Sequence, residues 1–429
     1  MLEIYFETYG CSANKNSSEI MKGIVKSAGL NLIENPERAD FVVINSCIVK
    51  EPTEAKIKKR INDFLKKDKK VILAGCMPRL SEKKFAHVNN LFLIDTSQVK
   101  NIVNLIKDIQ EGNYTSEKYL KKRNEVKLNS PKISEERIIG ITQISEGCLG
   151  ECKYCITKVA KGKLFSYPLE EIVKNVQRDV DSGCKEIWLT SQDCASYGNE
   201  DGKYLFPELL RNIIEIKGDF FIRIGMMNPN NVLKILPELI ELYKNTKMFK
   251  FLHIPIQSGS DKVLKEMGRN YKIADVMKIV KEFKKNFPDG VIATDIIVGY
   301  PGETERDFKE TYDLIQEIKP EILNSSKFWP RSGTPAARLK QVDRSIVIKR
   351  VSKLMKLHLD ICNENQLRWK YLETDVLIDQ KGFPGTFLAR DKNYRLFGVQ
   401  TTNKNLLGKV VKVKVKKVLP HYLVSEVKT

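Results

Sequence analysis

Three closely spaced cysteines form the part of the sequence with the clearest chemistry. Cys148, Cys152 and Cys155 follow one another with the spacing C-x3-C-x2-C, and we call them the loop cysteines. Iron–sulphur clusters are held by cysteine thiolates, normally four of them, and no fourth cysteine lies nearby in the sequence. Zinc is the alternative, but zinc sites take four ligands that usually come in paired C-x2-4-C units. The spacing therefore predicts a [4Fe-4S] cluster with one iron left open for another ligand.

A second set of cysteines is spread over the first hundred residues. Cys11, Cys47 and Cys76 each come shortly after a different strand-like segment, and we call them the strand-end cysteines. In an open parallel sheet, ligands bind beyond the carboxyl ends of the strands. Free cysteines are often just small buried apolar side chains, which is the competing interpretation. Their position after strands rather than within them favours a second cluster.

The elements around the strand-end cysteines alternate between strand and helix, which predicts a parallel α/β domain over residues 1–111. The expected strands are Leu2–Thr8, Phe41–Asn45, Val71–Ala74 and Leu91–Ile94. The expected helices are Ser17–Ala28, Pro52–Leu65, Ser81–Val88 and Val99–Ile109. Residues 112–136 are polar and predict a linker.

Strand and helix alternate again over residues 137–366, which predicts an incomplete parallel barrel of six β–α units. Such a barrel works at the carboxyl ends of its strands, and the loop cysteines follow the first of them. The expected strands are Ile138–Ser145, Glu186–Thr190, Phe220–Gly225, Phe251–Gln257, Val291–Val298 and Glu321–Phe328. Two of the expected helices are Leu169–Asp181 and Phe308–Ile318, and a long helix from Ser345 to Gln366 follows the last strand.

The chain ends, over residues 367–429, in short strand-like segments separated by turns. Near its end valines alternate with Lys412, Lys414 and Lys416, so that the lysines share one face of a strand. This pattern predicts a small antiparallel β-barrel with an RNA-binding row of lysines outside.

Composition limits the partners and the compartment. The chain has 73 Lys and Arg against 54 Asp and Glu, a net charge of +19, which favours nucleic acid as the partner. No secretory signal and no apolar segment long enough to cross a bilayer is visible, so we expect a cytoplasmic protein without membrane attachment. Nine cysteines in a reducing compartment favour metal binding over disulfides.

The loop cysteines, placed after the first strand of a partial barrel, resemble the radical S-adenosylmethionine superfamily. The resemblance implies that S-adenosylmethionine binds the open iron and is cleaved to a 5′-deoxyadenosyl radical. It implies that Tyr154 packs near the adenine, that Asp295 and Gly299 help to hold the adenosine, and that Ser191 and Gln192 meet the amino group of the cofactor. Tyr154 as an ordinary loop aromatic, and Ser191 and Gln192 in helix capping and loop hydrogen bonding, are the competing interpretations. For the segment after Gly299, the competing interpretation is a plain strand-to-helix turn with Glu303 or Thr304 capping the helix.

Three further residues are expected at the mouth of the barrel. Arg223 lies within the third strand, where it meets the carboxylate of the cofactor or makes a structural salt bridge. His253 and Gln257 bracket the fourth strand and are the predicted catalytic residues. A lone histidine is more often structural, and the resemblance favours the active-site role. Cys184, Cys194 and Cys362 have no ligand spacing and are expected to be structural.

The three parts together resemble the methylthiotransferases, a family with an auxiliary [4Fe-4S] cluster in its first domain and a C-terminal RNA-binding TRAM barrel. The stretch from Glu146 to Pro168 resembles the archaeal and eukaryotic branch that acts on N6-threonylcarbamoyladenosine in tRNA. The other supporting stretches are Gly10–Asn14, Asn45–Cys47, His253–Ser260 and Thr294–Thr304.

The resemblance implies methylthio transfer to C2 of that base, at position 37 of the anticodon loop. Its cofactors are two [4Fe-4S] clusters and S-adenosylmethionine. Its partners are tRNA, an electron donor protein and a sulphur donor of unspecified chemistry, and we expect a monomer. Within the family, isopentenyladenosine or a ribosomal protein aspartate are alternative substrates. A non-catalytic iron–sulphur RNA-binding protein is the alternative of another class.

Overall fold

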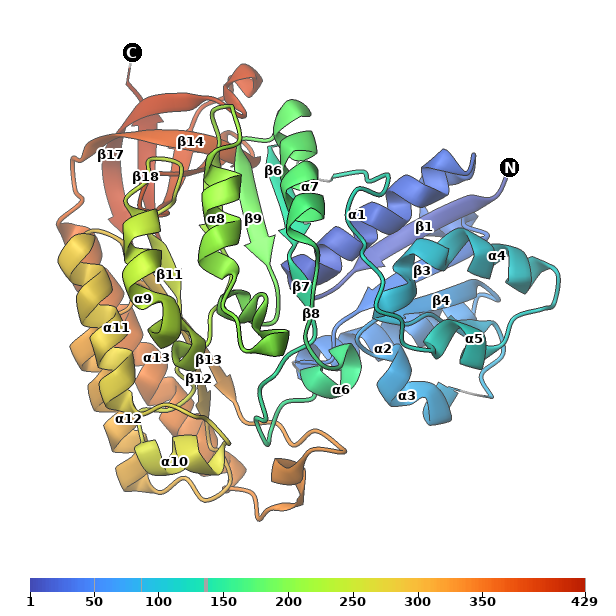
Figure 1. Cartoon of the computed structure of the whole chain (residues 1–429), viewed down its shortest axis with the longest axis horizontal. Helices are drawn as coiled ribbons and strands as arrows, with labels where there is room; N and C mark the ends of the chain where they lie inside the picture. The colour runs from blue at the N-terminus through green and yellow to red at the C-terminus, as the bar shows by residue number, and fades with distance from the viewer. Residues whose placement is uncertain (50, 86, 135–137, 429) are drawn as a thin grey trace. The chain divides into compact units, whose positions relative to one another are not determined.

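The protein is described by a computed structural model that covers residues 1–49, 51–85, 87–134 and 138–428 (Figure 1). Residue 86 in the expected helix Ser81–Val88, and residues 135–137 at the expected boundary between linker and barrel, lie outside the described residues. The chain forms two compact units. The first comprises residues 1–135, 141–149 and 155–175, and the second comprises residues 136–140, 150–154 and 176–429. Across the described ranges, no helix is both long and apolar enough to cross a membrane.

The first unit is built on a parallel sheet of five strands in the order β2-β1-β3-β4-β5. The strands are β1 (Glu3–Thr8), β2 (Asn31–Ile33), β3 (Phe41–Ser46), β4 (Lys70–Gly75) and β5 (Leu91–Leu93). The helices are α1 (Ser12–Ser27), α2 (Glu51–Leu65), α3 (Pro78–Phe85), α4 (Ile102–Gln110) and α5 (Ser116–Leu120). The edge strand β2 was not predicted, because three residues are too few to show an alternating pattern.

Both faces of this sheet are buried, as parallel sheets require. Val42 and Ile44 of β3 pack with Ile57 and Ile61 of α2 on one face. Phe41 and Val43 of the same strand belong to the core on the other face, with residues of α1 and α4. Strand β3 is buried along its whole length, so its sequence is a continuous apolar run that ends at Asn45 and Ser46. The polar groups therefore begin where the strand reaches the carboxyl edge.

The segment expected as a linker carries structure of its own. It contains α5, and Tyr119, Leu120 and Lys127 are buried in the first unit. Further along the chain, the first unit also contains a short antiparallel pair, β7 (Ser145–Glu146) with β8 (Phe165–Ser166), and the helix α6 (Thr157–Lys161).

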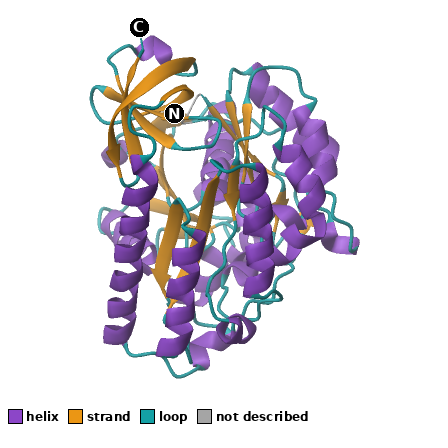
Figure 2. Cartoon of the chain, turned by 90° about the vertical axis from the view of Figure 1, so that its left-hand side faces the viewer, coloured by secondary structure: helices purple, strands orange, loops and turns teal. Residues whose placement is uncertain are grey.

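The central part has parallel strands inside and helices outside (Figure 2). Two sheets, β10-β9-β6 and β11-β12-β13, contain its strands, which are β6 (Ile139–Gln143), β9 (Glu186–Thr190), β10 (Phe221–Ile224), β11 (Phe251–His253), β12 (Val291–Val298) and β13 (Ile322–Lys327). The helices are α7 (Leu169–Asp181), α8 (Phe206–Ile214), α9 (Pro229–Tyr243), α10 (Asp261–Glu266), α11 (Ile273–Asn286), α12 (Glu305–Ile318) and α13 (Arg344–Leu367). Strand β11 is shorter than the expected Phe251–Gln257, because Pro255 has no N–H to continue the ladder.

The last residues form a closed barrel in the order β14-β15-β16-β18-β17. Its strands are β14 (Glu373–Lys381), β15 (Thr386–Arg390), β16 (Leu396–Gln400), β17 (Val410–Leu419) and β18 (Tyr422–Val427). Neighbouring strands are antiparallel except for β16 and β18, which run parallel. The predicted fold class is confirmed: a parallel α/β domain, a partial barrel and a small β-barrel.

Candidate active site

The strand-end cysteines come together at one edge of the first unit. Cys11, Cys47 and Cys76 follow the carboxyl ends of β1, β3 and β4, which are neighbours in the sheet. Cys76 lies close enough to the other two thiols to interact with them electrostatically. None of the three forms a disulfide, and their exposure falls from Cys11, which is exposed, to Cys76, which is buried.

A buried polar network ties the three strand-end loops to one another. Asn14, three residues after Cys11, donates from Nδ2 to the backbone oxygens of Tyr9 (2.9 Å) and Ser46 (2.8 Å). The backbone N–H of Cys76 donates to the oxygen of Ser46 at 2.9 Å. Asn45 donates to the backbone oxygen of Asn14 at 2.7 Å. The cysteines are therefore held on a rigid rim and not on free loops.

Gly10 allows the first two of these loops to approach closely. Its φ of +115° suits glycine, and an added Cβ would lie 2.8 Å from Cβ of Cys47 and 3.3 Å from its Sγ. A larger residue here would push Cys11 and Cys47 apart.

The chemistry of this donor set fits an iron–sulphur cluster. Three thiols on three loops, with no fourth cysteine, match a cluster that leaves one iron open. Among the described residues, no three His, Cys, Asp or Glu side chains are arranged to hold a single metal ion. Burial raises the pKa of Cys76 to about 12, so its thiol loses its proton when metal binds and not before.

Two lysines that the sequence did not single out are fully buried in the same unit. Lys127 and Lys161 both place Nζ 3.0 Å from Oε1 of Glu146, and Lys161 also donates to Oγ1 of Thr96 at 2.5 Å. Lysine is almost never fully buried unless it is paired. Nothing in the sequence distinguishes these two from the other lysines, because their burial depends on contacts between distant segments. We call them the buried lysine pair.

The ionisation of this network follows from its burial and its charges. Burial opposes the negative charge of Glu146, but the two lysines outweigh it and lower the pKa of that carboxyl to about 2. Burial also opposes the positive charge of Lys161, yet Glu146 and the thiols of Cys76 and Cys11 raise its pKa. Burial lowers the pKa of Lys127, whose charged neighbours are Glu146, Lys161 and Asp95.

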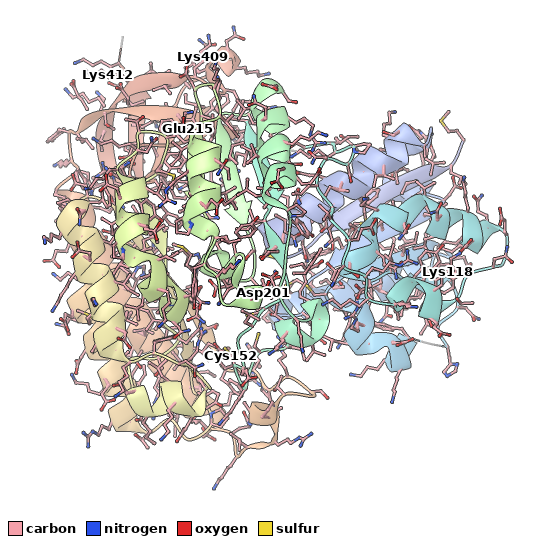
Figure 3. All side chains as sticks on the ribbon, viewed as in Figure 1. Lys118, Cys152, Asp201, Glu215, Lys409 and Lys412 are labelled. Carbon is pink, nitrogen blue, oxygen red and sulfur yellow. The ribbon has the colours of Figure 1, made fainter. Side chains whose placement is uncertain are left out.

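The loop cysteines follow β7 directly and are all partly buried (Cys152 is labelled in Figure 3). In the first unit, Gly147 has a φ of +81° and lies against the backbone of Lys163, and the N–H of Cys148 donates to the oxygen of Gly162 at 3.1 Å. In the second unit, the N–H of Lys153 donates to the oxygen of Met267 at 3.0 Å. The loop is therefore anchored through backbone hydrogen bonds on both sides of Cys152.

Tyr154, expected near the adenine, packs in the second unit. Its ring meets that of Tyr300 edge-on, with centroids 6.4 Å apart, and both belong to an apolar cluster with Val263, Met267 and Ala336. This cluster lies beyond the carboxyl end of β12. Tyr154 is thus a packed aromatic at the working end of the barrel.

Ser191 and Gln192 follow β9, also at the carboxyl end. The hydroxyl of Ser191 accepts from the N–H of Asp193 at 2.8 Å, which is a loop hydrogen bond. The 3-10 helix that follows, Cys194–Ser196, is capped by Asp193. The carboxyl of Asp193 accepts from the N–H of Asn228 at 3.0 Å and from Nδ2 of Asn231 at 2.6 Å, and burial raises its pKa to about 6. Gln192 is half-buried beside it.

Arg223 points to the inner side of the barrel and is surrounded by aromatic rings. Its guanidinium carbon lies 5.1 Å from the ring of Trp188, 5.0 Å from that of Phe251 and 5.7 Å from that of Tyr394. Its Nε is buried without a hydrogen-bond partner. The salt bridge considered from the sequence is replaced by cation–π contacts, and one donor is left for a ligand.

His253 and Asp295 meet on the inner side of the neighbouring strands β11 and β12. Nε2 of His253 lies 2.9 Å from Oδ2 of Asp295, and the ring of Phe251 lies between His253 and Arg223. Gln257 has a φ of +75°, and its backbone bonds to Asp295 and Ile297 at 2.8 and 2.9 Å. A non-glycine residue held in this region is strained, and such strain clusters at active sites.

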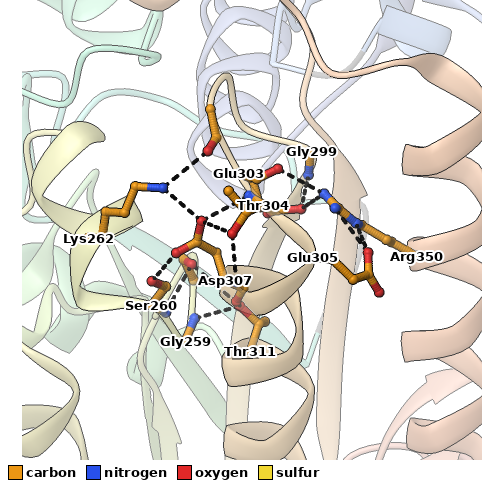
Figure 4. A network of polar contacts seen from close by, with 12 residues as sticks. Gly259, Ser260, Lys262, Gly299, Glu303, Thr304, Glu305, Asp307, Thr311 and Arg350 are labelled. Atoms are coloured by element: carbon orange, nitrogen blue, oxygen red, sulfur yellow. Dashed lines mark hydrogen bonds and ion pairs between the residues drawn. The ribbon is translucent and has the colours of Figure 1, made fainter.

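Gly299 and the start of α12 form the network shown in Figure 4. The N–H of Gly299 donates to Oε1 of Glu303 at 3.1 Å, and Arg350 donates to the same carboxylate oxygen at 2.8 Å. Burial raises the pKa of Glu303 to about 7. Thr304 caps α12 together with Asp307, as the competing interpretation of this segment proposed. Gly299 lies so close to Val347 that a Cβ would meet it at 2.4 Å.

The lysine row lies on β17, on the outside of the C-terminal barrel (Lys412 is labelled in Figure 3). Val413 and Val415 fill the barrel, so the alternation occurs as predicted. Lys414 lies 3.5 Å from a carboxylate oxygen of Glu373, and Lys416 lies 2.6 Å from Glu426. These two exposed pairs reduce the positive charge of the row.

The remaining cysteines are buried. Cys184 is 7% exposed, Cys362 is 2% exposed and Cys194 is fully buried. Burial raises the pKa of Cys194 to about 12, so this thiol is inert at neutral pH.

Comparison with known proteins assigns the class of this molecule first. Residues 142–315 match the radical SAM superfamily, residues 3–94 match the Uncharacterized protein family UPF0004 and residues 373–428 match the TRAM domain. The radical SAM methyltransferase TsrM from Kitasatospora setae has the same fold over 78% of this chain and 75% of its own, with a TM-score of 0.57 and 13% identity. The central part is therefore a radical SAM domain.

Relatives along the whole chain then identify the family. The probable threonylcarbamoyladenosine tRNA methylthiotransferase of Archaeoglobus fulgidus is 39% identical over 99% of this chain and 98% of its own. The human threonylcarbamoyladenosine tRNA methylthiotransferase is 34% identical over 98% of this chain and 73% of its own. The chain belongs to the threonylcarbamoyladenosine tRNA methylthiotransferase family, which confirms the predicted branch and the prediction of an enzyme.

Proposed function

We propose that the protein transfers a methylthio group to C2 of N6-threonylcarbamoyladenosine at position 37 of tRNA. Two observations carry the proposal. One is the similarity, along the whole chain, to proteins named for this reaction. The other is the presence of two separate three-cysteine sets, since the reaction needs both a radical and a source of sulphur.

The cofactors are two [4Fe-4S] clusters and S-adenosylmethionine. When bound, they supply reductive cleavage of the sulphonium to a radical, and a methylated sulphur for transfer. The loop cysteines would hold one cluster and the strand-end cysteines the other. An electron donor protein would be required, because the reductive cleavage of S-adenosylmethionine to a radical consumes an electron.

The inner side of the barrel would position S-adenosylmethionine and the base. Arg223 has a free Nε donor in an otherwise apolar surrounding, which suits a carboxylate. Ser191 and Gln192 follow β9, Gly299 follows β12, Asp295 lies within β12 and Tyr154 lies in the loop of the loop cysteines. These residues would surround the amino and adenosine parts. The rigid strand ends fix these groups in place before the substrate arrives.

His253 and Gln257 would act on the substrate side. The pair of His253 with Asp295 orients the imidazole and fixes which nitrogen faces the ligand. The backbone of Gln257, with a φ of +75°, departs from the regular strand conformation. Neither residue would remove the C2 hydrogen, because that C–H bond is not acidic and its cleavage requires a radical.

The C-terminal barrel would hold the RNA backbone. The net charge of +19 and the lysine row, in which Lys412 is exposed, suit contacts with phosphates. Exposed bases of the anticodon loop would enter the radical SAM domain. Because its substrate would be tRNA, we propose that the enzyme works in the cytoplasm. We propose that it acts as a monomer.

Nucleoside mass analysis of tRNA from a deletion strain tests this function. We expect loss of the 2-methylthio form of threonylcarbamoyladenosine, with the unmethylthiolated base accumulating. The wild-type gene should restore the modification, and a C152A gene should not. Loss of methylthio-isopentenyladenosine instead, or an unchanged nucleoside profile, would contradict the proposal.

A further inference from the structure

The buried lysine pair leaves an excess of positive charge inside the first unit. Lys127 and Lys161 are 0% and 2% exposed, and both contact the single carboxylate of Glu146. Thr96, the remaining partner of Lys161, is neutral. A buried charge without a counter-charge is unfavourable, so a second anion is expected here.

The two lysines differ in what else lies around them. Lys161 ends α6, which packs against α3, the helix that begins two residues after Cys76. Ala160 of α6 shares an apolar cluster with Cys76, and Lys161 interacts electrostatically with Cys76 and Cys11. Lys127 lies near Asp95, whose carboxylate is already paired with Arg79 at 2.7 Å. Of the pair, Lys161 is therefore the lysine on the element that packs beside the strand-end cysteines.

Metal binding would supply the second anion. Cysteine binds metal as the thiolate, so each of the three strand-end cysteines brings a negative charge when the site is loaded. A sulphide on the open iron would bring more. The positive charge of Lys161 and the negative charge of the loaded site are then complementary.

We propose that Lys161 is a positioning residue of the sulphur-donating site: its ammonium group, fixed by Glu146 and Thr96, is the counter-charge of the cluster on Cys11, Cys47 and Cys76 and of the sulphide that the cluster carries. The inference rests on the proposed function and names the residue that controls the charge of its auxiliary site. Charge and hydrogen bonding near a cluster set its reduction potential. Lys161 therefore stabilises the more negative, reduced cluster and strengthens sulphide binding.

The test uses the full chain with the substitutions C148A, C152A and C155A, so that about four irons remain and all belong to the strand-end site. K161M removes the charge and keeps an unbranched side chain. K127M is the matched control, because Lys127 is equally buried and contacts the same oxygen of Glu146. K161R restores the charge. The midpoint potential is measured by a redox titration followed by electron paramagnetic resonance.

We expect K161M to lower the ratio of reduced to oxidised cluster about tenfold at a fixed potential, a shift of about −59 mV for one electron. K127M should shift the potential by less than a third of that, and K161R should stay near the parent. Titration with sodium sulphide, followed by the same spectra, should show about tenfold weaker binding in K161M alone.

Several outcomes would overturn the inference. Equal shifts in K161M and K127M would show a general effect of buried charge, and no shift in K161M with intact iron would show that Lys161 is not the counter-charge. If K161M loses its iron while its circular dichroism is unchanged, retention of iron by K161R and K127M supports the inference. Loss of iron and helicity in K161R as well would make the residue structural. A parent without iron would overturn the cluster site, and with it the proposed function.

Discussion

The two cysteine sets reach the same donor chemistry by different routes. The loop cysteines lie within one short loop, and their separation is set by the chain between them. The strand-end cysteines are far apart in sequence and meet because β1, β3 and β4 are neighbours in one parallel sheet. A local motif can thus be lost by one substitution in a loop, whereas the dispersed site depends on strand register and on its polar network.

The two cysteine sets also differ in the burial of their surroundings. The strand-end site has a deeply buried thiol in Cys76 and a fully buried cation in Lys161. The loop cysteines are all partly exposed, as suits a site that must admit S-adenosylmethionine. We infer that the surroundings of the strand-end site control its charge, whereas those of the loop cysteines admit a ligand.

The largest expected effect comes from C152A, which should abolish the activity of the loop-cysteine site and leave the cluster of the strand-end site in place. Reductive cleavage of S-adenosylmethionine should fall below detection, because the loop loses one of its three thiolates, while about four of about eight irons remain. Iron content and 5′-deoxyadenosine formation are the measurements. Loss of all iron would show that the two sites do not load independently, and would break the comparison.

C76A should have the opposite signature. Methylthiolation of tRNA should be lost, whereas S-adenosylmethionine cleavage by the loop site should continue at a rate within a few-fold of the parent. C184A is the matched control, since Cys184 and Cys76 are both 7% exposed. It should leave both activities and the iron content unchanged. If C76A still methylthiolates tRNA, the strand-end cysteines are not the sulphur-donating site.

H253A should reduce methylthiolation about 10- to 100-fold without changing the iron content, because a misplaced substrate costs about that much. D295N should cause a smaller loss, since it removes the partner of the imidazole at 2.9 Å but leaves the ring in place. Single-turnover product formation, with iron assayed in parallel, measures both variants. Unchanged turnover in H253A would show that His253 is not an active-site residue.

The smallest expected effect concerns stability at the barrel rim (Figure 4). Asp307 accepts from Thr304 Oγ1 at 2.6 Å, from Ser260 at 2.8 Å and from Lys262 at 3.0 Å. Burial opposes the charge of Asp307, but these donors outweigh it and lower its pKa. D307N should reduce the free energy of unfolding by about 1–3 kcal/mol at pH 7.

The sign of the pH dependence follows from the lowered pKa. The contribution of Asp307 is complete above its unfolded pKa of about 3.9 and is lost as the pH falls through the lower folded pKa. The deficit of D307N should therefore shrink between pH 4 and pH 2, as measured by urea unfolding. D313N, at an exposed pair with Lys309, should change stability by less than about 0.5 kcal/mol at any pH. The iron of the strand-end site should be unaffected by either variant.

Much of the fold was predictable because its strands and helices have regular apolar patterns. Strand β12 was predicted with its observed bounds, and β1, β3 and β4 within one residue. The short β2, the early end of β11 and the parallel pairing of β16 with β18 were not, because each depends on a partner strand and not on the local pattern. The loop hydrogen bond of Ser191 and the capping role of Thr304 were foreseen as competing interpretations, since both follow from local sequence.

The sequence by itself determined the spacing of Cys148, Cys152 and Cys155, the order of the three domain types and the family to which the chain belongs. These properties are local or statistical, so the covalent chain is enough to define them. The positions of Cys11, Cys47 and Cys76 after three strands also predicted one shared edge of a parallel sheet. Only the tertiary structure decided that three aromatic rings surround Arg223 and that Lys161 is buried with Glu146. Such contacts join segments that meet only when the strands pair and the helices pack, and no spacing along the chain encodes them.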